Sequence, residues 1–159
     1  MEDSKKPRKI LFVCLGNICR SPAAEGVMKS VLASEKAQGW TIDSAGTGDY
    51  HIGDLPDSRM RSAASRRGLD LTHRCRQVCQ SDFEDSDLII GMDANNMYNL
   101  RRMAPSAESV SKLKPMADFL REGCGYDYVP DPYYEGAEGF ELVLDLLEDG
   151  CRNIYRAYK

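Results

Sequence analysis

A cysteine and an arginine with five residues between them, Cys14 and Arg20, stand out in the segment CLGNICRS at residues 14–21. The planar guanidinium of an arginine can hold two oxygens of a phosphate group at once. A cysteine in such positively charged surroundings is expected to be a thiolate, which is a nucleophile. The pair therefore predicts attack of the Cys14 sulfur on phosphorus. The Ser21 hydroxyl is placed to stabilise that sulfur when it leaves again.

The residues between the cysteine and the arginine suit a loop that wraps an anion. Successive backbone N–H groups can turn inward there, and the start of a following helix adds further unpaired donors. Gly16 allows close backbone approach, and Asn17 tolerates a left-handed conformation. The sequence lacks the Gly-Lys-Ser/Thr of a Walker loop and has no G-x-G-x-x-G. The predicted phosphate-binding loop adds Leu15, Gly16, Asn17, Ile18, Cys19 and Ser21 to the cysteine and arginine.

Transfer of a phosphoryl group to sulfur also needs an acid that protonates the departing oxygen. Asp131, in the segment VPDPYY at residues 129–134, is the candidate. The two prolines stiffen its loop, and Pro132 disfavours helical backbone at the residue before it. Tyr133 and Tyr134 are candidates for the walls of the cleft, where they can stack on an aromatic leaving group.

The elements that must position these residues alternate between strand and helix. Strands are expected at residues 9–14, 40–44, 87–92 and 110–115, and helices at about 21–39, 58–67, 81–85, 93–103 and 140–158. Ser21 is the expected N-cap of the first helix, with Pro22 in its first turn. This alternation predicts an α/β fold with a parallel sheet between two layers of helices. Ligands of such sheets bind beyond the carboxyl ends of the strands, where Cys14 lies.

Composition restricts the class of protein. The 159 residues are 42% hydrophobic and 29% charged, as in one globular domain, and the net charge of −4 disfavours nucleic-acid binding. No apolar run is long enough for a membrane span, and residues 1–7 lack the apolar core of a secretory signal, so a cytoplasmic location is expected. The six cysteines are then expected to be reduced thiols. A zinc site is disfavoured, because the only histidines are His51 and His73.

Taken together, these segments resemble the low molecular weight protein tyrosine phosphatases. The resemblance rests on residues 11–25 and 131–134, with shorter matches at 43–47, 76–77, 82–83 and 92–93, and covers about residues 8–158. It implies one domain over residues 8–159, preceded by a flexible extension at 1–7. The implied architecture is a three-layer α/β/α sandwich whose four parallel strands have the order 2-1-3-4.

The resemblance also implies an activity. This is hydrolysis of phosphotyrosine, and of small aryl phosphates as an acid phosphatase, through a phosphocysteine intermediate and without a metal or other cofactor. Cys14 is then the nucleophile, Arg20 the phosphate clamp, and Asp131 the general acid and later the base. The expected partners are phosphotyrosine proteins, with phosphate or other oxyanions as product or inhibitor, and the chain is expected to be mostly monomeric.

Further site residues follow from the same resemblance. Cys19 is expected to form a reversible disulfide with Cys14 under oxidation. His51 departs from the family pattern, in a variable loop that contacts the substrate. The implied supporting network consists of Asn17, Ser21, Ser44 and His73, and the implied pocket walls are Tyr50, His51, Tyr133 and Tyr134. The other cysteines, Cys75, Cys79, Cys124 and Cys151, are expected to be structural.

Three other functions use related residues. A thiol-linked arsenate reductase on the same fold needs further cysteines, and Cys75 and Cys79 are the nearest pair. A phosphoarginine phosphatase resembles this family but tends to have Thr where this chain has Ile18. A non-catalytic phosphoprotein-binding module does not need an intact nucleophile, clamp and acid. The intact set, the two adjacent tyrosines and Ile18 favour the tyrosine phosphatase.

Overall fold

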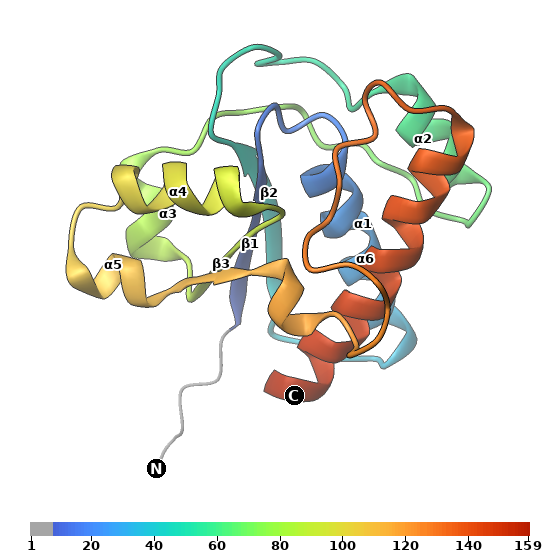
Figure 1. Cartoon of the computed structure of the whole chain (residues 1–159). Coiled ribbons are helices and arrows are strands. Elements are labelled where there is room, and N and C mark those ends of the chain that lie inside the picture. Colours follow the sequence, from blue (N-terminus) through green and yellow to red (C-terminus); the bar gives the residue numbers. More distant parts are fainter. Residues whose placement is uncertain (1–7) are drawn as a thin grey trace.

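Four parallel strands form the centre of the computed structural model, which describes residues 8–159 (Figure 1). The strands β1 (Lys9–Cys14), β2 (Thr41–Gly46), β3 (Leu88–Gly91) and β4 (Leu113–Pro115) have the order β2-β1-β3-β4, as expected. Cys14 pairs with Gly46 of β2, and Val13 pairs with Gly91 of β3. The carboxyl ends of these three strands therefore meet at one edge of the sheet. The extension expected at residues 1–7 lies outside the described residues.

Helices cover both faces of the sheet and complete the three-layer α/β/α sandwich. Figure 1 shows α1, α2 and α6 on one face and α3, α4 and α5 on the other. The helices are α1 (Arg20–Ser34), α2 (Ser58–Ser65), α3 (Gln80–Asp85), α4 (Ala94–Met103), α5 (Ala107–Ser111) and α6 (Ala137–Tyr158), with the 3₁₀ helix η1 (Met116–Phe119). No helix within residues 8–159 is long and apolar enough to cross a membrane.

Alternation along β1 decides which face Cys14 belongs to. Ile10, Phe12 and Cys14 are buried in the core that contains α1, α2 and α6, whereas Leu11 and Val13 are buried in the opposite core. This follows from the two-residue period of a strand. Both faces of the strand are buried, as in parallel sheets generally. The Cys14 thiol therefore lies under α1 and α6 and not toward α4.

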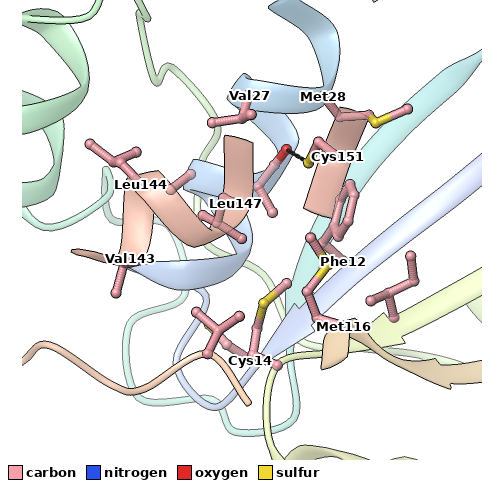
Figure 2. Close-up of a cluster of buried hydrophobic side chains, with 14 of the residues drawn as sticks. Phe12, Cys14, Val27, Met28, Met116, Val143, Leu144, Leu147 and Cys151 are labelled. Carbon is pink, nitrogen blue, oxygen red and sulfur yellow. Dashed lines mark hydrogen bonds between the residues drawn. The ribbon is translucent and has the colours of Figure 1, made fainter. Parts of the chain in front are cut away.

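The packing between α1 and α6 holds the end of β1 in place (Figure 2). Val143, Leu144 and Leu147 have the spacing of one helix face, form a buried stripe on α6 and pack with Val27 of α1. Cys151 continues this stripe, and its thiol donates a hydrogen bond to the Ala24 carbonyl over 3.8 Å. The expected C-terminal helix is confirmed, and it begins at Ala137.

The ends of several elements differ from the expectations. The helix α1 begins at Arg20 and ends at Ser34, so Ser21 lies inside its first turn and is not the cap. The Ser21 hydroxyl instead contacts the phosphate loop, at Cys14 and Asn17. Residue preferences at helix ends do not predict such a contact. Residues 107–111 form α5 and shorten the fourth strand, because Ser106 caps this helix by accepting a hydrogen bond from the Ser109 N–H over 3.1 Å. Asp93 caps α4, as predicted.

Candidate active site

The segment between β1 and α1 is a tight loop whose carbonyl groups point away from its centre. The surrounding chain donates hydrogen bonds to them: from Thr47 N–H to Cys14 (3.0 Å), from Gly48 N–H to Leu15 (2.9 Å), from Asp57 N–H to Ile18 (2.7 Å) and from the Cys75 thiol to Asn17 (2.8 Å). Among the described residues, the N–H groups of residues 15–19 have no acceptor. A loop with bonded carbonyls and free N–H groups is a nest for an anion.

Asn17 holds the loop in this shape. Its φ angle of 58° is in the left-handed region, which a non-glycine residue adopts only when its surroundings over-determine it. Its side-chain amide donates hydrogen bonds to the Ser21 and Ser44 hydroxyls over 2.8 and 3.1 Å. The amide oxygen accepts from the Arg76 backbone N–H over 2.9 Å and lies 2.8 Å from His73 Nε2. Both polar ends of this fully buried side chain are therefore satisfied.

A second tier of polar residues supports Asn17. The Ser44 hydroxyl donates a hydrogen bond to Glu25 Oε1 over 2.7 Å, and His73 Nδ1 lies 3.3 Å from the same oxygen. Because Asn17 Oδ1 can only accept, His73 Nε2 must carry the hydrogen of their contact. The structure thus brings Asn17, Ser21, Ser44 and His73 into one connected network, and this network includes the buried carboxylate of Glu25.

The Cys14 thiol is buried at the base of the loop, and its sulfur lies 3.1 Å from the Ser21 hydroxyl oxygen. Because the Asn17 amide donates to that oxygen, the hydroxyl hydrogen can point either toward the sulfur or toward the Ala45 carbonyl, which lies 3.4 Å from the oxygen. The start of α1 adds the positive end of a helix dipole. These groups favour negative charge on the sulfur.

Arg20 is 3% exposed, and the groups around it fix its guanidinium. It donates hydrogen bonds to Asp93 Oδ2 over 2.6 Å and to the Val129 carbonyl over 2.9 Å. A second nitrogen, Nη2, lies 3.9 Å from Asp131 Oδ2. Interaction with the Cys14 and Asp93 charges raises the pKa of Arg20 despite its burial, so it is a permanent cation. The cation and the thiol therefore share one cavity.

The loop with Asp131 lies on the same face of the sheet as α1 and α6, because Val129 is buried in the core that contains Cys14. Its start is fixed by the Val129 N–H, which donates a hydrogen bond to the Met92 carbonyl over 2.8 Å. The Asp131 side chain is half exposed, and its Oδ1 accepts from the Tyr133 N–H over 3.0 Å. Tyr133 and Tyr134 follow, with ring centres 5.1 Å apart in an edge-to-face arrangement. The carboxyl group thus faces the cavity from a short, anchored turn.

These groups surround one cavity of about 200 Å³. Tyr50 and His51, from the loop after β2, line it together with Tyr133 and Tyr134. The His51 ring covers Gly16, where a Cβ atom would lie 3.1 Å from the His51 Cδ2. The lining residues are Cys14, Leu15, Gly16, Ile18, Cys19, Arg20, Tyr50, His51, Asp131, Tyr133 and Tyr134. A thiol and a cation at the base with aromatic rings at the rim suit a phosphate group on an aromatic carrier.

Known proteins share this sequence and fold. Residues 9–159 match the family model described as low molecular weight phosphotyrosine protein phosphatase. The chain belongs to this family. It is 46% identical to low molecular weight phosphotyrosine protein phosphatase 1 of Drosophila melanogaster, over 91% of this chain and 92% of that protein. A crystal structure of a protein tyrosine phosphatase from Entamoeba histolytica superposes with a TM-score of 0.89 at 46% identity, covering 93% of this chain and 94% of that one.

A solved structure that is named as an arginine phosphatase has the same fold. The Drosophila arginine phosphatase superposes on this phosphatase with a TM-score of 0.88 at 30% identity, over 95% of this chain and 98% of that one. A protein named as a tyrosine phosphatase and one named as an arginine phosphatase therefore share this fold.

Three residues of this phosphatase that contact the site were not among the predicted site residues. Asp93 lies two residues after the end of β3 and binds Arg20; its position at the carboxyl edge of the sheet was a usable signal. Glu25 lies four residues after Ser21, hence on the same face of α1. Cys75 was expected to be only structural. Burial raises the pKa of its thiol to about 11, so it keeps its proton and donates it to the Asn17 carbonyl.

One group of polar residues has the composition of a cation site. Ligand atoms of Glu25, Asp43 and His73 lie within 4.8 Å of one another. Their carboxylates are already neutralised, since Lys29 binds Glu25 over 2.7 Å and Arg76 binds Asp43 over 2.9 Å. These residues are better described as the outer part of the hydrogen-bond network that holds the phosphate loop.

The contact between Arg20 and Asp93 leads to a first prediction. Asp93→Asn keeps an oxygen for the α4 cap, which accepts from the Asn96 N–H, but removes the charge that orients the guanidinium. We expect kcat/KM for an aryl phosphate to fall by roughly 10- to 100-fold, with the free energy of unfolding changed by less than about 1 kcal/mol. Steady-state kinetics and urea unfolding measure both quantities.

The control is Asp87→Asn. Asp87 accepts a hydrogen bond from the backbone N–H of Lys9 at the opposite end of β1. This substitution therefore makes the same chemical change at a carboxylate that is remote from the cavity. Equal kcat/KM in the wild type and in Asp93→Asn would show that Arg20 does not depend on Asp93.

Proposed function

We propose that this phosphatase hydrolyses phosphotyrosine in proteins, and small aryl phosphates, through a phosphocysteine intermediate. The observation that carries the proposal is the cavity in which free backbone N–H groups, the Arg20 guanidinium and the Cys14 thiol converge below the rings of Tyr50, Tyr133 and Tyr134. The proposed catalytic unit is one domain over residues 8–159.

In the first step, the Cys14 thiolate attacks phosphorus and the bond from phosphorus to the phenolic oxygen breaks. The N–H groups of residues 15–19 and the Arg20 fork bind the three other phosphate oxygens, where negative charge is carried in the transition state. Asp131, in its protonated form, gives its proton to the departing oxygen. Tyrosine leaves, and the phosphoryl group remains on sulfur.

In the second step, water attacks the phosphocysteine. The Asp131 carboxylate accepts a proton from this water, and the bond from phosphorus to sulfur breaks. The leaving sulfur receives negative charge next to the Ser21 hydroxyl, 3.1 Å away, which stabilises it by a hydrogen bond. The products are inorganic phosphate and the enzyme in its starting state, so no metal or other cofactor takes part in the proposed sequence.

The lining of the cavity supports this function over its rivals. An arsenate reductase needs a third thiol within reach of the adduct, and among the residues that line the cavity the thiols are Cys14 and Cys19. Cys75 is buried behind the loop, and Cys79 is exposed outside it. A phosphoarginine phosphatase is the nearer alternative, given the fold it shares with the Drosophila arginine phosphatase. The apolar Ile18 side chain and the three tyrosines of the cavity favour an aromatic substrate.

A panel of substrates tests the proposed function. We expect the wild-type protein to release phosphate from a phosphotyrosine peptide with kcat/KM at least about 100-fold above that for the phosphoserine and phosphoarginine forms of the same peptide. Arsenate with a thiol reductant tests the reductase in parallel. Cys14→Ser should bind phosphate and release none. Preferred hydrolysis of phosphoarginine, or turnover by Cys14→Ser, would contradict the proposal.

We further propose that oxidation reversibly inhibits the enzyme through a Cys14–Cys19 disulfide. Both thiols line the cavity, and both are more than nine-tenths buried. Peroxide would oxidise the Cys14 thiolate to a sulfenic acid and release hydroxide. Attack by the Cys19 sulfur would then form the disulfide and release water. Burial and the nearby Asp57 carboxylate raise the pKa of Cys19, so the second reaction should become faster as the pH rises.

Peroxide treatment and peptide mapping test this disulfide. We expect activity to be lost and then restored by dithiothreitol, with one disulfide between Cys14 and Cys19 in the inactive form. Cys19→Ser should instead lose activity irreversibly, because its sulfenic acid has no resolving thiol and oxidises further. A disulfide from Cys14 to Cys75 would overturn the assignment. So would equal recovery of activity by dithiothreitol in the wild type and in Cys19→Ser.

A further inference from the structure

A second hollow lies beside the active-site cavity, on the other side of Tyr50. It is formed by the loop after β2 and the last turns of α4, and its lining includes Thr47, Tyr50, Gln77, Asn99 and Arg102. Leu15 and Tyr50 line both spaces. Tyr50 is 72% exposed, so its ring is a low wall between the two and not part of the core.

The polar side chains that line this hollow can all donate hydrogen bonds, and its one charged lining side chain is Arg102. In the part of the chain that the structure covers, no carboxylate lies within ion-pair distance of Arg102, and its guanidinium stacks only on the Tyr98 ring, at 5.7 Å. The Thr47 hydroxyl is buried and has no hydrogen-bond partner among residues 8–159. Such a set is complementary to a carboxylate.

The arginines of the hollow on the opposite side of the cavity, unlike Arg102, have carboxylate partners within residues 8–159. This hollow lies behind Tyr133 and is lined by Arg59 and Arg66. Arg59 is paired with Asp57 over 2.9 Å, and Arg66 is paired with Glu141 over 3.1 Å. These two positive charges are already neutralised. Of the two hollows that flank the cavity, the one at Arg102 therefore has an arginine without a carboxylate partner among the described residues.

We propose that the hollow at Arg102 binds the side chain of an acidic residue near the phosphotyrosine of a protein substrate. A phosphotyrosine in the cavity leaves its main chain at the rim, next to Tyr50. An extended peptide advances roughly 7 Å in two residues, enough to pass this wall. Arg102 is then a specificity-determining residue, and the phosphatase selects phosphotyrosine sites with acidic neighbours. This inference rests on the proposed function and adds the substrate sequence to it.

The test uses three phosphotyrosine peptides that differ only in the two residues on each side, which are all aspartate, all alanine or all lysine. The wild-type protein should hydrolyse the aspartate peptide with kcat/KM about two- to fivefold above the alanine peptide, the range of an exposed ion pair. The lysine peptide should fall below both. The preference should shrink as salt is added, because the charges are exposed.

Arg102→Glu should reverse the order and favour the lysine peptide. The matched control is Arg101→Glu, which makes the same charge change in the same last turn of α4, at an exposed residue that does not line the hollow. This control should keep the preference for aspartate. Comparing ratios between peptides within each variant cancels any change in the catalytic step itself.

Each other outcome overturns the inference. Equal kcat/KM for the three peptides in the wild type would show that the hollow selects nothing. An aspartate preference that persists in Arg102→Glu would assign it to other groups. If Arg101→Glu and Arg102→Glu reduce the aspartate preference equally, the preference comes from the overall positive charge of the end of α4 and not from the hollow. If the wild type hydrolyses none of the peptides, the proposed function itself fails, whereas equal rates overturn only the acidic subsite.

Discussion

The site depends on one constraint, which is that the carbonyl groups between β1 and α1 are held outward. Hydrogen bonds from the loop after β2, from Asp57 at the start of α2 and from the Cys75 thiol fix them there. The N–H groups are left to face inward, where they have no acceptor among the described residues. Most of the residues that carry these donors line the cavity, so the fold maintains a preformed position for an anion at the end of its central strand.

The rest of the molecule can be understood as support for this loop. Asn17 holds its left-handed turn, and Glu25 and His73 hold Asn17 through the polar network. Arg20 joins the loop to the other half of the sheet, because it binds both Asp93 after β3 and the Val129 carbonyl before the catalytic turn. The proposed acid, Asp131, is distant in sequence from the proposed clamp, Arg20, yet its Oδ2 lies 3.9 Å from Arg20 Nη2.

The sequence was sufficient to predict the strand order, through a family resemblance, and the location of the site at the end of β1. The strand that ends at Cys14 and the C-terminal helix that includes Leu147 were predicted from local patterns, and both are present in the fold. Contacts that depend on tertiary structure were missed. Ser21 was predicted as an N-cap because serine followed by proline is common at the start of a helix. Its hydroxyl instead contacts the Cys14 sulfur in the loop. Cys75 reaches Asn17 across 58 positions, and no local pattern predicts that hydrogen bond.

The central claim is that phosphate passes through the Cys14 sulfur, and trapping this intermediate tests it most directly. Asp131→Asn cannot activate water, so mixing it with an aryl phosphate that has a good leaving group should accumulate phosphocysteine. Acid quenching and intact-protein mass spectrometry should then find one added phosphoryl group, mapped to Cys14 and absent from Cys14→Ser. A phosphoryl group on another residue, or on Cys14→Ser, would contradict the account.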